Sequence, residues 1–236
     1  MTSRNRTARL AGLLYLTLLI FGILSIVYIP SQLIVWEDGT KTVKNIKEFE
    51  ILFRVGIASG IIAFLAFMFL SLLLYKLLHK VNETQARLMV LFVLISIPIS
   101  FVNMLHRFSV LSLVSKPAYL QGYDSIVLHD QVMLQLEYFN NGVQISYIFT
   151  GLWLFPFGYL VYKSEFLPKV IGILLIISGT SYLVDFFGKL LFLNYQNTII
   201  PIIVGIPGSI GEFAVCLWLL IMGTNKLKIG KTANSI

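Results

Sequence analysis

The chain has 236 residues, of which 57% are apolar and only 12% carry a charge. Soluble domains have about 25% charged residues, so this composition excludes a soluble surface and indicates an all-α, polytopic membrane protein. The formal net charge of +7 does not call for nucleic acid as a partner, because lysine and arginine gather beside membrane-spanning helices for topological reasons.

Six apolar stretches are long enough to cross a hydrocarbon core about 30 Å thick at 1.5 Å per residue. The first follows a basic segment, residues 1–9, and is too long for the apolar region of a cleaved signal peptide, so we interpret it as a retained helix. A basic tail, residues 223–236, follows the last. The transmembrane domain is expected over residues 10–222, with spans at about 10–29, 53–75, 88–111, 142–162, 170–192 and 200–222.

The two longer connections are expected to contain structure of their own. Between the first two spans, Val43, Ile46, Phe49 and Phe53 recur at helical spacing, which predicts a short amphipathic helix on the outer membrane interface. The connection over about 112–141 is too long for a structureless link, so it is expected to hold a helix or to cap that face. The predicted fold is a six-helix transmembrane bundle with a short interfacial helix.

The distribution of basic residues predicts the orientation of the chain. With a cytoplasmic N-terminus, eleven of the eighteen lysines and arginines fall on the inner side, as the positive-inside rule requires. Both termini are then cytoplasmic, and the interfacial helix faces outward.

Seven polar side chains lie within the predicted spans or at their ends, where an ionised group costs roughly 2.5–3.5 kcal/mol at the bilayer centre. The third span carries three of them on one helical face, and the fifth carries two that are one turn apart. These candidate ligand-binding residues are Arg54, Asn103, His106, Arg107, Asp185, Lys189 and Glu212.

The two carboxylates are the hardest of these to explain as ordinary packing. Lysine and arginine can extend toward the headgroups, but a short aspartate cannot, so Asp185 is expected to pair with Lys189 or Arg107. Glu212 lies deepest and must be protonated, paired with His106 or an arginine, or open to a watery cavity. We interpret the group either as a structural ion-pair cluster or as a polar pocket in the outer half of the bundle.

Such a pocket would bind or move a small anionic or lipid-like ligand. The three histidines, His79, His106 and His129, show no zinc-binding spacing, and no serine-nucleophile motif is present, so we expect neither a metal nor a cofactor. Two alternatives stay open: an intramembrane enzyme acting on a lipid or isoprenoid substrate, and an accessory or sensor subunit whose buried charges are structural.

Four stretches resemble a single family: RLAGLLYL at 9–16, NIKEFEILFRVGIAS at 45–59, the segment 158–185 that ends in SYLVD, and IGEFAVCLWLLIMG at 210–223. They are similar to the bacterial integral-membrane family called domain of unknown function 4386. The resemblance implies a six-helix protein of a bacterial plasma membrane, with membrane lipids as partners and no assigned activity. It places Arg54, Asp185 and Glu212 at polar motif positions, whereas the segment around 96–140 matches least.

Overall fold

The computed structural model describes residues 3–224, without the side chains of residues 3, 204 and 206–209. Throughout this part the regular elements are helical, which confirms the all-α prediction. From residue 225 onward the predicted basic tail lies outside the described residues. The elements are α1 Ser3–Ile23, the π-helical turn η1 Leu24–Tyr28, α2 Ile29–Leu33, α3 Gly39–Glu48, α4 Glu50–Leu78, α5 Glu83–Ser115, the 3₁₀ turn η2 Ala118–Leu120, α6 Ser125–Lys163, α7 Lys169–Leu191, the 3₁₀ turn η3 Tyr195–Asn197 and α8 Ile200–Ile221.

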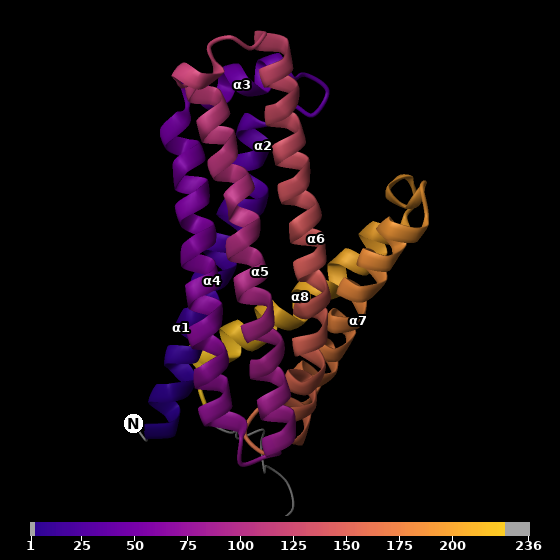
Figure 1. Cartoon of the computed structure of the whole chain (residues 1–236). Helices are drawn as coiled ribbons and strands as arrows, with labels where there is room; N and C mark the ends of the chain where they lie inside the picture. Colours follow the sequence, from indigo (N-terminus) through magenta and orange to yellow (C-terminus); the bar gives the residue numbers. More distant parts are fainter. Residues whose placement is uncertain (1–2, 225–236) are drawn as a thin grey trace, which may run out of the picture.

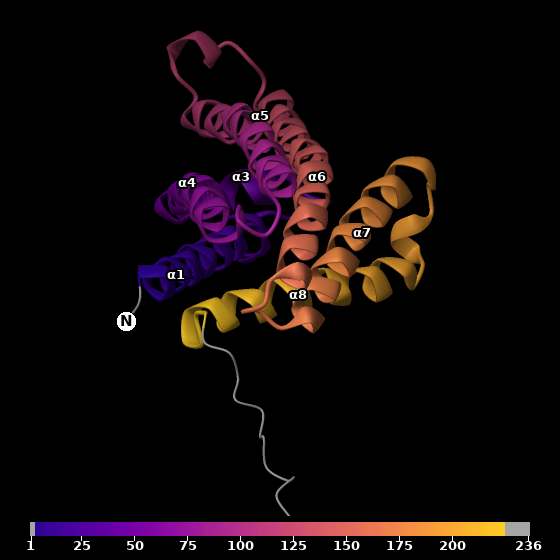
Figure 2. The same ribbon diagram turned by 90° about the horizontal axis from the view of Figure 1, so that it is seen from below.

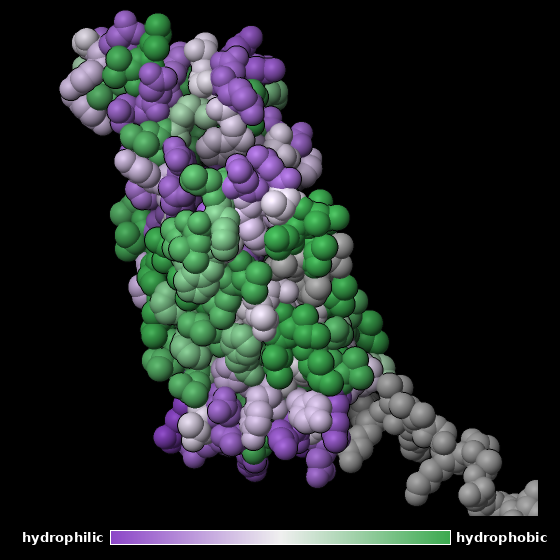
Figure 3. All heavy atoms as spheres, turned by 90° about the vertical axis from the view of Figure 1, so that its right-hand side faces the viewer, coloured by the Kyte–Doolittle hydropathy of each residue, from purple (hydrophilic) through white to green (hydrophobic). Residues whose placement is uncertain are grey.

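Five helical stretches of the described chain are long and apolar enough to cross a membrane: the continuous run Arg4–Leu33, and α4, α5, α6 and α7. On the face seen in Figure 3, apolar side chains form a belt between hydrophilic side chains at the two ends. The described apolar stretch of α8 is shorter, Ile210–Ile221. The structure therefore supports a membrane protein with five candidate spans, and the sixth span stays a prediction.

Helices α5 and α6 extend well beyond the predicted spans 88–111 and 142–162. They contain 33 and 39 residues, or about 50 and 58 Å at 1.5 Å per residue. Most of the predicted connection 112–141 is the first part of α6, which begins where Asp124 caps the amide of Ile126. This first part of α6 is amphipathic, with apolar residues spaced three and four apart on one face. The opposite face is polar and lowers the mean hydropathy, so the segment was not predicted as part of an apolar span. The stripe consists of Leu128, Val132, Leu136, Phe139 and Val143, all buried.

The predicted amphipathic helix is present as α3. It begins after Asp38, whose side chain accepts a hydrogen bond from the amide of Lys41, and it buries Val43 and Ile46. Its apolar face packs across the ends of α4, α5 and α6, at the top of the bundle in Figure 1. Phe49 follows the helix and is exposed, so the buried stripe is shorter than the predicted one. This helix closes one end of the bundle.

The helices form two groups that separate toward the α3 end. Helices α1, α4, α5 and α6 run side by side along the long axis, whereas α7 and α8 form a hairpin that leans away from them (Figures 1 and 2). Near its C-terminus α8 presses against α1, where an added Cβ at Gly12 would lie 2.5 Å from the amide nitrogen of Leu220. Farther along α1, a Cβ at Gly22 would meet no described atom of another segment within 4 Å. The two helices therefore diverge between these glycines.

Four glycines form the contact between α6 and α7. A Cβ at Gly158 would lie 2.7 Å from the carbonyl oxygen of Gly172, and one at Gly151 would lie 2.9 Å from that of Gly179. In each helix the two glycines are seven residues apart, so they fall on one face and the backbones touch at both positions. Close backbone approach at small residues is a principal source of helix association in membranes. The contact of these four residues, the glycine seam, holds the hairpin to the bundle.

We predict that Gly158→Ala destabilises the protein by about 1–3 kcal/mol, because a methyl group forced against a backbone carbonyl must separate the helices. This loss outweighs the gain of roughly 1 kcal/mol that alanine brings to a helix interior. Gly22→Ala is the matched control and should be neutral or stabilising, since its methyl group enters open space. Unfolding in detergent would measure both, and equal effects at the two glycines would contradict the seam.

Candidate functional site

A cavity of about 340 Å³ lies between the four-helix group and the α7–α8 hairpin. The side contributed by α1 and α4 is largely apolar, whereas α5, α6, α7 and α8 contribute polar groups. Among the described residues, one acidic residue and no basic residue line it. The polar lining residues are Ser25, Ser96, Ser100, Asn103, Ser146, Tyr147, Thr150, Tyr182 and Glu212.

Glu212 of α8 accepts hydrogen bonds on both carboxylate oxygens. The hydroxyl of Tyr15 in α1 donates to Oε2 at 3.0 Å, and the hydroxyl of Tyr182 in α7 donates to Oε1 at 2.8 Å. The glutamate is 6% exposed. The sequence predicted that Glu212 is protonated, paired with His106 or an arginine, or open to a cavity. The structure places it at a cavity, with two phenols as hydrogen-bond donors, while His106 and the arginines lie elsewhere. Hydrogen bonds to a carboxylate are roughly twice as strong as neutral ones, so this triad ties three helices together.

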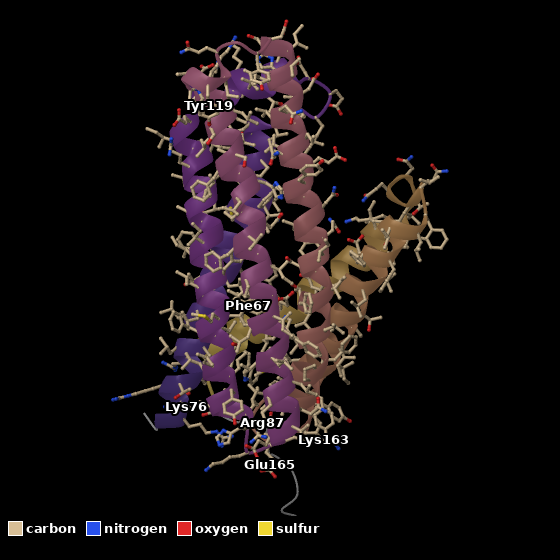
Figure 4. All side chains as sticks on the ribbon, in the orientation of Figure 1. Phe67, Lys76, Arg87, Tyr119, Lys163 and Glu165 are labelled. Carbon is tan, nitrogen blue, oxygen red and sulfur yellow. The ribbon has the colours of Figure 1, made fainter. Side chains whose placement is uncertain are left out.

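An aromatic cluster packs beside the triad. The indole of Trp153 is fully buried, stacks on Phe157 with ring centroids 5.0 Å apart, and meets the edge of Phe67 at 5.0 Å. Phe67 lies below mid-height in Figure 4. Trp153 and Phe67 both line the cavity. The indole N–H has no hydrogen-bond acceptor within the described part of the chain, so a donor is left in the cavity wall.

The serine and threonine hydroxyls in the wall donate to backbone carbonyls, that of Ser25 to Gly56 in α4 and the other four to carbonyls of their own helices. Ser100 donates to Ser96 at 2.9 Å, and Thr150 donates to Ser146 at 3.2 Å. Ser96 and Ser146 do the same to Val93 and Gly142. Because each hydroxyl proton is occupied, the oxygen lone pairs are what these side chains offer to the cavity. The wall is therefore rich in hydrogen-bond acceptors.

Asn103 holds α5 against α6 at the edge of the cavity. Its amide nitrogen donates to the carbonyl of Phe139 at 2.8 Å, and the side chain occupies the space that a Cβ at Gly142 would need. Asn103 is buried, and its role in the bundle is a helix-to-helix hydrogen bond beside the cavity.

Arg107 is a buried cation, only 2% exposed, that stabilises an irregular turn of the first span. In η1 the amide of Ile29 donates to Leu24, and the next residue, Pro30, has no N–H, so the carbonyl of Ser25 loses its helical donor. Arg107 Nη2 donates to that carbonyl at 2.8 Å. The guanidinium also lies 4.0 Å from the ring centre of Phe139, a cation–π contact.

The remaining candidates do not line the cavity, and each has a partner outside it. Asp185 and Lys189 form an ion pair at 2.6 Å within α7, which is one of the two predicted pairings of this aspartate. Arg54 pairs with Glu50 at 2.7 Å, with more than half of its side chain exposed. The Nδ1 atom of His106 lies 2.8 Å from Oε1 of Gln135. Of the seven predicted residues, the structure brings Asn103 and Glu212 to the cavity, with Arg107 behind Ser25.

The sequence model of the family described as domain of unknown function (DUF4386) matches residues 10–223. The chain belongs to this family. It is also similar to an uncharacterized protein of Archaeoglobus fulgidus, with 35% identity over 97 residues, which cover 41% of this chain and 56% of that protein. No solved structure matches the chain.

The family match spans every residue of the Glu212 triad, yet the sequence interpretation missed the tyrosines and the hydroxyls around it. Tyr15 and Tyr182 lie within spans whose other residues are mostly apolar, which is an unusual place for a phenol. Ser96 and Ser100 are four residues apart on one face of α5, with Asn103 on the same face. In the described part of the chain no three histidine, cysteine, aspartate or glutamate side chains lie together as metal ligands would.

We predict that Arg107→Met destabilises the protein by about 2–4 kcal/mol, because it removes a charged hydrogen bond and leaves the Ser25 carbonyl unpaired. The cost should shrink in a Pro30→Ala background, where residue 30 regains an N–H that can serve the η1 carbonyls. A double-mutant cycle of unfolding free energies measures this coupling.

Arg54→Gln is the control for the loss of a positive charge, and its exposed ion pair should contribute no more than about 1 kcal/mol. Additive effects of Arg107→Met and Pro30→Ala would contradict the assignment of Arg107 to the η1 carbonyl.

Proposed function

We propose that this protein binds a lipid-like molecule that enters the cavity sideways from the bilayer. The observation that carries the proposal is the composition of the cavity rim. Ile23, Val27 and Phe213 line the cavity and are 45%, 59% and 41% exposed, and they lie where α1 and α8 diverge within the apolar belt. Such a rim admits acyl chains, while the polar groups lie inside.

The chemistry of the wall selects the headgroup of this ligand. Glu212 and the serine and threonine oxygens are acceptors, the indole N–H of Trp153 is an unused donor, and no lysine or arginine among the described residues lines the space. A carboxylate without a nearby cation disfavours an anion. The proposed ligand therefore has a hydroxyl- or amine-bearing headgroup, and the anionic ligand expected from the sequence is not supported by this cavity.

The size of the cavity limits how much of the ligand it can enclose. Ligand pockets typically measure about 300–1,000 Å³, and this one lies at the small end, at about 340 Å³. It suits a headgroup and the first part of one chain, with the rest of the chain passing between Val27 and Phe213 into the lipid.

We also propose that α8 completes a sixth span and that both termini of the chain face the cytoplasm. Lys76, Arg87 and Lys163 lie at the end opposite α3 (Figure 4), and Arg4 at the start of α1 lines the same hollow as Lys76 and Lys163. This basic end fits the positive-inside rule. The proposed location is the plasma membrane. The enzyme and accessory-subunit alternatives stay predictions.

The proposal is tested with Trp153 as the reporter, in a Trp36→Phe, Trp218→Phe background that leaves it as the sole tryptophan. A neutral monoacylglycerol brominated on its chain should quench Trp153 saturably, because the heavy atoms enter the cavity. A brominated fatty acid, whose headgroup is anionic, should bind more weakly. Glu212→Gln should weaken monoacylglycerol binding about 10-fold or more, since a hydrogen bond to a charged group contributes roughly 1.5–3 kcal/mol.

Gly22 provides the matched control for access through the rim. Gly22→Phe places a ring at the mouth, where no other described residue lies within 4 Å of the added Cβ, and should abolish quenching without loss of stability. Gly22→Ala should leave quenching unchanged. Unsaturable quenching that is equal in all variants would contradict the proposal.

A further inference from the structure

A second hollow, of about 990 Å³, lies at the basic end of the bundle. It is bounded by the start of α1, the end of α4 with the turn after it, the end of α6 and the loop that follows. Four basic side chains from these separate segments line it: Arg4, Lys76, Lys80 and Lys163. Figure 4 shows Lys76 and Lys163 at this end, on opposite sides of the molecule's axis. This space is distinct from the cavity at Glu212.

The charge around this hollow is unbalanced. Within residues 3–224, none of the four basic side chains forms an ion pair. The basic side chain of Arg87, at the same end, does have a carboxylate partner, Glu83 at 2.7 Å. In the described part of the chain, only one carboxylate, that of Glu165, lines the hollow. Four cations that face one space repel each other, and an anion bound among them relieves that repulsion.

Part of the site is held in position before any ligand binds. The guanidinium of Arg4 lies 3.8 Å from the ring centre of Phe166, a buried residue, which limits its rotamers and leaves its N–H groups available. The remaining lining includes the apolar side chains Leu77 and Val81. A charged rim beside apolar contacts suits an anionic group that adjoins the bilayer.

We propose that the basic hollow, lined by Arg4, Lys76, Lys80 and Lys163, binds a phosphate-bearing anion. Arginine recognises phosphate through two parallel N–H groups, and lysines add point charges around the remaining oxygens. Basic pockets between membrane helices bind anionic lipid headgroups on the same principle. The phosphate belongs either to a phospholipid of the adjacent leaflet or to a soluble compound. This proposal does not depend on the cavity at Glu212.

The test is thermal unfolding of the full chain in nanodiscs. Phosphatidylcholine discs are the reference, phosphatidylglycerol discs supply the lipid headgroup, and phosphatidylcholine discs with inorganic pyrophosphate supply the soluble anion. We expect the unfolding temperature to rise in at least one of the two anionic conditions, and the rise to fall with added salt. A rise with phosphatidylglycerol alone identifies a lipid, and a rise with pyrophosphate identifies a soluble phosphate.

Lys76→Gln with Lys163→Gln should remove that rise. The control pair, Arg6→Gln with Lys169→Gln, removes two positive charges at the same end from residues that do not line the hollow, and should keep it. No rise in either anionic condition would overturn the proposal. An equal loss in both pairs of variants would also overturn it, because the effect would then be general surface charge.

Discussion

A polar group inside the apolar belt must find its partner within the protein, because lipid chains offer no hydrogen bonds. The Glu212 carboxylate depends on this constraint most directly, and it is met by two phenols from two other helices. The same constraint explains Arg107, which supplies a donor to a carbonyl that the helix itself cannot satisfy. In both cases a polar side chain holds helices together, a role that the apolar core has in a soluble protein.

The cavity follows from how the α7–α8 hairpin is attached. The glycine seam binds α7 closely to α6, and Gly12 lets the end of α8 touch α1. These contacts lie toward the basic end, whereas the hairpin leans away toward the α3 end (Figure 1). The cavity begins on the α3 side of these contacts, and Glu212 lies where it begins. The position of the carboxylate at the closed end of the opening gives the cavity one polar end and one apolar rim.

Much of the fold could be predicted from the sequence because long apolar runs and basic flanks are strong local signals. The all-helical class, the helix at Gly39–Glu48 and the ion pair between Asp185 and Lys189 follow from spacing along one chain segment. The full length of α6 could not be predicted in this way, since its amphipathic first half has low mean hydropathy.

The cavity was predicted only in part, because it depends on which helices meet. Intrahelical spacing placed Asn103, His106 and Arg107 together, yet they donate to or contact Phe139, Gln135 and Ser25 on neighbouring elements. The sequence predicted one cluster of opposite charges, whereas the structure has separate ion pairs within single helices. The tyrosines and serines of the cavity wall were not predicted, because they carry no charge. The seven-residue spacing of Gly151 and Gly158, and of Gly172 and Gly179, was a signal for the glycine seam.

A density map of the full chain in lipid nanodiscs tests the central claim most directly. We expect elongated density that passes between Val27 and Phe213 and ends within hydrogen-bonding distance of Glu212. A map in which α1 and α8 close over this opening, with the Glu212 carboxylate turned away from Tyr15 and Tyr182, would contradict it.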